Sequence, residues 1–227
     1  MARIFLLMLI SAFVLTSCVI RKEFYAPSVE PTKQLAQPLS KGARFAIIST
    51  LGNEAGVRKG QQYAVYEVPS LTFISHRLGQ EAEKVLNNAG YKEVSLHYVP
   101  TVNPLSHTQS QGQLSAEGRT FIDENTHGQA DYALVITPPL NWKDAFFVNC
   151  GQEEGNLYVG FTLYVINIKD HRITARYQAN FHEPLRSFAA CTVKDPTFRL
   201  KSAIYNAEDN AYTLLVKTLR QAFALTQ

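Results

Sequence analysis

The sequence predicts a mixed α/β (α+β) fold, in which a mixed sheet with an antiparallel hairpin carries two main amphipathic helices on one face. Three observations favour it: short apolar or alternating runs that suit strands, two long runs with the period of one helix face, and a polar break between two strand-like runs. The chain has 227 residues, of which 46% are hydrophobic. That composition excludes a disordered or collagen-like chain and is enough for one sizeable domain.

The first strand is expected at residues 44–51, because this run is mostly apolar and rich in β-branched residues. Residues 62–68 alternate between apolar and polar side chains, which indicates a second strand. Gly52, Gly56 and Gly60 lie between the two runs and indicate a polar loop or a mobile hairpin. The segment lacks the Gly-Lys-Ser/Thr ending of a phosphate-binding loop, so we do not expect it to hold a nucleotide.

Residues 71–89 have apolar side chains at intervals of three and four, the period of one helix face. Ser70 is the expected N-cap, and Gly90 is the expected stop because glycine readily adopts the left-handed conformation that ends a helix. Residues 91–99 are expected to form the next strand. The polar segment 100–128 is expected to be a mobile loop with at most one helical turn near its end.

The second half of the chain predicts a strand at residues 130–137 and a hairpin with arms at 157–168 and 173–181. Asp195 and Pro196 indicate the start of a last helix, since proline is favoured at the first helical position. The apolar residues of this helix repeat the period of one face: Ile204, Ala207, Ala211, Leu215, Leu219, Ala222 and Phe223.

The N-terminus has the pattern of a secretory signal, with a short basic start followed by an apolar run at residues 4–15. About twelve residues are too few to cross a hydrocarbon core of roughly 30 Å. The sequence Leu15-Thr16-Ser17-Cys18 resembles the lipobox of bacterial lipoproteins. This resemblance implies that residues 1–17 are a signal peptide and that Cys18 becomes the acylated first residue, with palmitate among its acyl chains.

Position 19 is the residue that directs sorting in lipoproteins of this kind, where Asp commonly signals retention at the inner membrane. Here it is Val19, so we expect a lipid anchor in the cell outer membrane and a chain that faces the periplasm. Residues 18–41 contain three prolines and no sustained apolar period, which indicates a flexible tether. Residues 42–227 are then the single α/β domain.

Cys150 and Cys191 remain after Cys18 is assigned to lipid, and an oxidising compartment favours a disulfide between them. Directly opposed residues of a hairpin have a constant sum, and a symmetric turn centred on Asp170 and His171 gives the same sum as the two cysteines. The register therefore predicts that they lie close together. A reactive cysteine beside a histidine is the alternative, which the spacing supports poorly.

No cofactor, metal site or catalytic set is expected from the sequence. None of the six histidines has the spacing that places two imidazoles on one metal ion, and there is no Gly-x-Ser-x-Gly elbow of a serine hydrolase. The formal charge of +3 is too weak and too dispersed for a nucleic-acid surface.

An aromatic stretch before Cys150 is the expected partner-binding patch, with Trp142, Phe146 and Phe147 as its anchors. The alternative is that these rings complete the core. The whole layout resembles small envelope lipoproteins with one α/β domain, including uncharacterised families and some that assist secretion or cell-wall synthesis.

These patterns predict a membrane-anchored, non-catalytic binding or accessory component of a cell-envelope complex, with an envelope protein as its partner. Two alternatives remain open. One is an envelope hydrolase with an unrecognised site built from His97, Asp131 or His182. The other is a carrier of lipid or peptide.

Overall fold

The predicted α/β class is confirmed by the computed structural model, which describes residues 28–33, 39–100, 104–105, 112–139, 144–151, 155–185, 191 and 196–223. Within these residues the chain forms nine strands and three helices. The strands are β1 (Ser28–Lys33), β2 (Arg44–Ser49), β3 (Glu54–Lys59), β4 (Gln62–Glu67), β5 (Lys92–Tyr98), β6 (Tyr132–Thr137), β7 (Phe146–Cys150), β8 (Gly155–Asn167) and β9 (Arg172–Leu185). The helices are α2 (Ser70–Asn88), α3 (Ala116–Thr126) and α4 (Thr197–Ala222).

The long strand β8 organises the sheet. One of its edges pairs with β9, which in turn pairs with β1. The other edge divides: residues 155–159 pair with β7, which continues to β3 and β4, and residues 162–167 pair with β6, which continues to β2 and β5. The division lies at Gly160, whose N–H donates to the carbonyl of Ala145 at 2.9 Å. Parallel and antiparallel pairs both occur, so the sheet is mixed as predicted.

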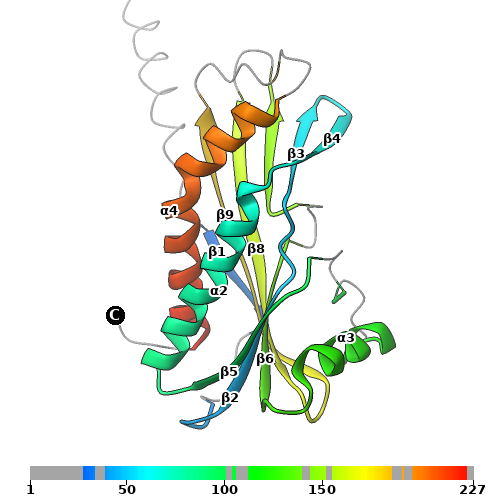
Figure 1. The fold of residues 1–227 in the computed structure, drawn as a ribbon, viewed down its shortest axis with the longest axis vertical. Helices are drawn as coiled ribbons and strands as arrows, with labels where there is room; N and C mark the ends of the chain where they lie inside the picture. Colours follow the sequence, from blue (N-terminus) through cyan, green and yellow to red (C-terminus); the bar gives the residue numbers. More distant parts are fainter. Residues whose placement is uncertain are drawn as a thin grey trace, which may run out of the picture.

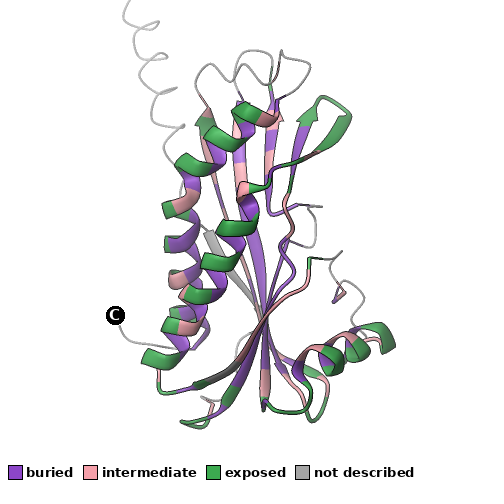
Figure 2. Cartoon of the chain, in the orientation of Figure 1, coloured by how far each residue is buried: buried purple, intermediate pink, exposed green. Residues whose placement is uncertain are grey.

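The two long helices pack against one face of this sheet, as the sequence predicted, and α3 packs against the other (Figure 1). The main core lies beneath α2 and α4, and both helices turn their buried residues toward the sheet and their exposed residues outward (Figure 2). A smaller core beneath α3 is formed by residues such as Ile48, Ile122 and Tyr164.

Helix α2 follows the predicted periodicity but does not begin with the predicted cap. The N-cap residue is Pro69, and the Ser70 side chain makes no capping hydrogen bond, because Ser70 already lies within the helix. The predicted stop is confirmed: Gly90 has φ +84°, a conformation that side chains rarely adopt. Gly79 lets the helix approach the sheet closely, since a Cβ there would lie 2.8 Å from a methyl carbon of Leu96.

The glycine-bearing segment between the first two expected strands contains the strand β3, which forms an antiparallel hairpin with β4, so the prediction of a polar loop is wrong and the hairpin interpretation holds. Its turn contains Gly60 at φ +59°, as a two-residue hairpin with glycine first requires. Ala55 and Val57 are buried on the helix side. The apolar residues of β3 are small or few, so the apolar pattern did not predict a strand here.

The predicted tether of residues 18–41 also extends too far. Residues 28–33 form β1, which pairs antiparallel with the free edge of β9. Proline lacks an N–H group, and Pro31 is accommodated because β1 is an edge strand whose register shifts between Pro31 and Lys33. The domain therefore starts earlier than residue 42.

The segment 100–128 contains a full helix, α3, where one turn was expected. Ser115 caps it by accepting a hydrogen bond from the backbone N–H of Gly118 at 3.1 Å. His127 ends it in the left-handed conformation at φ 47°. Ile122, with no exposed surface, and Thr126, at 2%, are the buried side chains of this helix, so a largely polar sequence gave only a weak apolar signal for it.

The hairpin of β8 and β9 is confirmed, but its predicted register is wrong. Paired residues sum to 340 up to Val165 and to 339 beyond it, because the register shifts between Val165 and Ile166. Cys150 is not on this hairpin: it ends β7 and pairs with Gly155. The sulfur atoms of Cys150 and Cys191 nevertheless lie at disulfide distance, with their Cα atoms 5.6 Å apart.

Among the described residues, no helix combines the length and the apolar character needed to cross a membrane.

Candidate functional site

A groove lies between the first halves of α2 and α4 on the outer surface of the helical layer. It has a volume of about 450 Å³, and we call it the α2–α4 groove. Phe73 and Ile74 line it from α2, and Phe198, Ser202 and Tyr205 line it from α4.

Three aromatic rings of the α2–α4 groove are far more exposed than other large apolar side chains of the described residues. The exposed fractions are 78% for Phe73, 76% for Phe198 and 72% for Tyr205, whereas Val65 on β4 reaches 44%. Single exposed apolar residues are ordinary, but a cluster of them indicates an interaction surface.

Helix periodicity explains why these rings point outward. Leu71 and Ile74 occupy the buried face of α2, and Phe73 stands off that face. Phe198 and Tyr205 are seven residues apart, so they share one side of α4, away from the buried stripe that includes Ile204. The fold therefore places three rings together without using any of them to complete its core.

The groove is lined by one basic and one acidic residue, Lys201 and Glu208, and Glu208 is neutralised by its ion pair with Arg77. Arg199 adds a basic residue in the first turn of α4, and within α2 and α4 the acidic residues nearest the helix starts are Glu81 and Glu208. The two helix N-termini add partial positive charge at the same end. Anionic groups are thus favoured at this surface.

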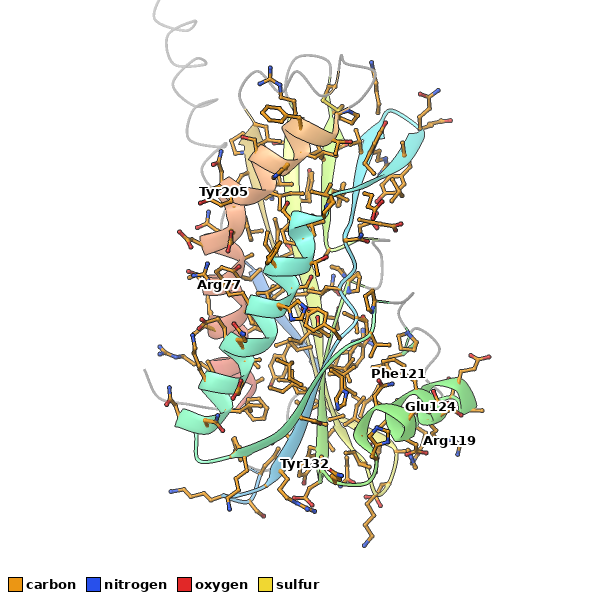
Figure 3. The ribbon with its side chains drawn as sticks, in the orientation of Figure 1. Arg77, Arg119, Phe121, Glu124, Tyr132 and Tyr205 are labelled. Atoms are coloured by element: carbon orange, nitrogen blue, oxygen red, sulfur yellow. A yellow bond between two sulfur atoms is a disulfide. The ribbon has the colours of Figure 1, made fainter. Side chains whose placement is uncertain are left out.

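Below the groove, α2 and α4 are joined by a compact polar contact (Figure 3, where Arg77 and Tyr205 are labelled). Arg77 forms an ion pair with Glu208 at 2.8 Å, and its guanidinium carbon lies 4.2 Å from the centre of the Tyr212 ring. The Tyr212 hydroxyl donates to Glu208. Burial and the Glu208 carboxylate raise the pKa of Tyr212, so the tyrosine stays neutral and the contact fixes the floor of the groove.

A small group of buried hydroxyls lies under α2, where Ser49, Ser75 and Tyr98 approach one another. Burial raises the pKa of Tyr98 to about 12, and the two serines partly offset this rise. His76 stacks its ring on Tyr98, with ring centres 3.7 Å apart. Among the described residues, neither serine oxygen is hydrogen-bonded to the His76 ring, so this geometry pairs no hydroxyl nucleophile with a base.

Of the predicted partner patch, the two described residues, Phe146 and Phe147, lie on opposite faces of β7. Trp142 lies outside the described residues. Phe146 is only 3% exposed and belongs to the main core, because alternation along β7 turns it toward the helices. Phe147 lies on the opposite face, where its ring stacks on Tyr158 at 4.7 Å. For Phe146 the prediction is wrong, and the alternative, a core role, holds.

The residues suggested for a hydrolase lie in separate places. Asp131 precedes β6 and accepts hydrogen bonds from Arg44, which hold the pKa of the Asp131 carboxyl below its usual value. His182 pairs with Tyr158 on β8. Tyr158 lies about nine residues along β8 from the end that is near Asp131, so His182 and Asp131 are separated by roughly 30 Å of strand. The two cannot act on one substrate atom.

His97 is also separated from these two residues. It pairs with Ile48 on β2, four positions or about 13 Å of strand from Arg44, the partner of Asp131. It lies on β5, with the ring of His127 6.3 Å away. Burial and the neighbouring imidazole lower the pKa of His97. In the part of the chain that the structure describes, no three His, Cys, Asp or Glu side chains are grouped in a way that could hold a metal ion.

The groove residues Phe73, Phe198 and Tyr205 were missed by the sequence prediction. A signal for them was present, since each is an aromatic residue that falls off the apolar stripe of an amphipathic helix. Such misplaced rings mark an exposed apolar face once the helix boundaries are fixed. Only the contact of the two helices shows that the three rings share one surface.

No protein-family model and no curated protein matches this chain. Solved structures with a related shape include the PelC dodecamer from Paraburkholderia phytofirmans, at 13% identity and a TM-score of 0.39, covering 89% of this chain and 100% of PelC. The protein XCC0632 from Xanthomonas campestris, of the family DUF330, is 13% identical with a TM-score of 0.37, covering 87% of this chain and 97% of that protein.

Lipoprotein GNA1162 from Neisseria meningitidis is also similar, at 14% identity and a TM-score of 0.35, covering 74% of this chain and 99% of the lipoprotein. At these TM-scores the similarity assigns neither a function nor a partner to this chain.

Proposed function

We propose that this protein is a lipid-anchored, non-catalytic accessory protein of the bacterial cell envelope, and that the α2–α4 groove is its binding surface. The observation that carries the proposal is the cluster of Phe73, Phe198 and Tyr205, each more than 70% exposed on one face. Exposed aromatic rings on rigid helices bind well because little side-chain entropy is lost on contact.

The anchor in this proposal is Cys18, acylated at the end of its lipobox-like sequence. Several acyl chains hold a protein in a bilayer almost irreversibly, so no membrane-spanning helix is needed. Val19 directs the chain to the outer membrane, where the domain faces the periplasm. Disulfide formation between Cys150 and Cys191 fits that oxidising compartment.

The binding surface is tested with native membranes. The mature chain carrying Cys18→Ser, which has no lipid, is sedimented with envelope membranes from the bacterium that encodes it. A groove variant, Phe73→Ser with Phe198→Ser and Tyr205→Ser, is expected to bind at least tenfold more weakly. Val65→Ser is the matched control, because it removes an exposed apolar side chain from β4. Equal binding by all three proteins contradicts the proposal.

The anchor is tested separately in growing cells. Radiolabelled palmitate is expected to enter the wild-type protein and not Cys18→Ser, and Val19→Asp is expected to move the protein from the outer to the inner membrane fraction. A mature protein whose first residue is an unmodified cysteine by mass spectrometry contradicts the anchor and leaves the groove experiment interpretable.

A further inference from the structure

We infer that the α2–α4 groove docks on the headgroup layer of the bilayer that holds Cys18, so that the outer face of the first halves of α2 and α4 lies on the membrane. This inference rests on the proposed lipid anchor and names the component that the groove binds. Three features carry it: the direction in which the chain enters the sheet, the length that separates Cys18 from the sheet, and the chemistry of the groove rim.

The direction of entry follows from strand pairing. Ser28 lies opposite Asn180 on β9, and the two strands are antiparallel. Strand β9 is in turn aligned with α4, because Glu183 accepts a hydrogen bond from Asn210 and the Tyr177 hydroxyl donates to the carbonyl of Ala222.

Strand β9 and helix α4 are therefore antiparallel: the level of Glu183 on β9 corresponds to Asn210 on α4, and the level of Tyr177 corresponds to the end of α4. Strand β1 runs in the same direction as α4, from the level of Asn180 to that of Arg176. The chain that precedes Ser28 consequently enters from the side of the molecule where α4 starts.

The segment from Cys18 to Ser28 is long enough to reach the level of the groove. From Asn180 to Glu183 is about 10 Å of strand, and from Asn210 back to Phe198 is about 18 Å of helix, so Phe198 stands about 28 Å beyond Ser28. The ten residue-to-residue steps from Cys18 to Ser28 can span up to about 33–36 Å. A lipid on Cys18 can thus lie level with Phe198, and Tyr205 is nearer still.

The chemistry of the rim fits a bilayer surface. Phe and Tyr rings are suited to the boundary between headgroups and acyl chains, and Lys and Arg are attracted to anionic lipid headgroups. Arg199 and Lys201 lie beside Phe198 and Tyr205, with no acidic residue before Glu208 on α4. Glu208 itself is paired with Arg77. A bilayer with anionic lipids complements this set of charges and rings.

The short segment between Cys18 and the sheet allows even a small surface patch to bind the bilayer. The lipid holds the domain within a few nanometres of the bilayer, so the effective concentration of the surface is high and modest intrinsic affinity is enough. The anchor alone fixes distance but not orientation. Docking of the groove would fix orientation and turn the outer face of α2 and α4, near the starts of both helices, toward the membrane.

The first experiment measures depth in the bilayer. Lipidated protein is reconstituted in vesicles of phosphatidylethanolamine and phosphatidylglycerol (3:1), with tryptophan introduced as Tyr205→Trp or, as a control on β4, Val65→Trp. Brominated acyl chains are expected to quench the added fluorescence of Tyr205→Trp by at least half, after subtraction of the wild-type signal, and to leave Val65→Trp unchanged. Equal quenching of the two variants overturns the inference.

The second experiment identifies what is bound. The Cys18→Ser mature chain is sedimented with the same protein-free vesicles, and binding is expected to fall at least tenfold for the groove variant and at least threefold for Arg199→Gln with Lys201→Gln. Circular dichroism melts verify that these surface variants fold.

Binding to native membranes that protease treatment abolishes, with none to vesicles, identifies a protein occupant: the inference then fails while the proposed function stands. Loss of a self-associated state in the groove variant, seen by sedimentation equilibrium, also overturns the inference in favour of a second copy. Absence of groove-dependent binding to either membrane, together with equal quenching of the two tryptophan variants in the lipidated protein, overturns both.

Discussion

Aromatic residues are buried at one end of the α2 and α4 helix pair and exposed at the other. Where the helices end, Phe45 from β2 is fully buried between Tyr91, Tyr132 and Phe223, with ring centres 5.4 to 5.6 Å apart. Where the helices start, three rings are more than 70% exposed. We call the end where the helices finish the closed end, because the Phe45 side chain packs among the rings there. We call the end where they start the open end, because its three rings lie exposed on the outer face. Stability and binding are therefore expected to separate along the helix pair.

The largest effect on stability is expected at the closed end. Phe45→Ala removes a ring with no exposed surface and leaves a cavity among three neighbouring rings. The free energy of unfolding should fall by about 3–5 kcal/mol, measured by urea denaturation. A loss below about 1 kcal/mol would mean that the ring cluster contributes little to the core.

The disulfide should have the next largest effect, and it acts toward the open end. Cys191 precedes α4 and is joined to Cys150 at the end of β7, at a sequence separation of 41. Replacing both cysteines with serine should lower the free energy of unfolding by about 2–4 kcal/mol, because the unfolded chain is no longer constrained.

Hydrogen exchange locates this effect. In the double serine variant, amides in the first turns of α4 should exchange faster than in the wild type, and amides of β2 should change less. Uniform acceleration across both ends would contradict a local role for the Cys150 to Cys191 bond and would weaken the contrast between the ends.

A smaller, pH-dependent effect is expected from Tyr98, which lies beneath α2 between the two ends. Burial raises its pKa to about 12 from an unfolded value of about 10. The folded state therefore binds this proton more tightly than the unfolded state. The resulting stability is fully present below pH 10 and is lost as the pH rises toward 12.

Tyr98→Phe removes that proton, so its free energy of unfolding should fall less steeply between pH 10 and pH 12 than that of the wild type. Urea denaturation at several pH values measures the two slopes. Parallel slopes would show that the Tyr98 hydroxyl ionises equally readily in the folded and unfolded states.

Periodic patterns predicted the parts of this fold that bury apolar residues regularly. The strands β2, β5 and β6 and the helices α2 and α4 have such patterns, and each was found near its expected position. Strand β3 was missed because Ala55, Gly56 and Val57 give only a weak apolar signal. Strand β1 was missed because Pro31 reads as a break, although an edge strand tolerates it.

Non-local geometry limited what could be predicted about the site. A bulge at Val165 and the position of Cys150 on β7 invalidated the predicted register, although the cysteines do meet. Whether Phe146 is buried depends on which face of β7 meets the helices, and whether Phe198 is exposed depends on which side of α4 meets the sheet. For Phe146 the outcome is fixed by packing between distant segments, whereas the position of Phe198 off the apolar stripe of α4 was a local signal whose shared surface with α2 only the packing of the two helices shows.

The smallest effect on stability is expected at the open end, where it is most informative. Phe198→Ala removes a ring that is 76% exposed, so little burial is lost and alanine favours the helix. Its free energy of unfolding should stay within about 0.5 kcal/mol of the wild type, measured beside Phe45→Ala under the same conditions. The same variant should bind membranes more weakly, because the exposed ring is retained for contact and not for folding. If Phe198→Ala instead destabilised the chain as much as Phe45→Ala, the ring would be part of the core in solution and the two ends would no longer differ in kind.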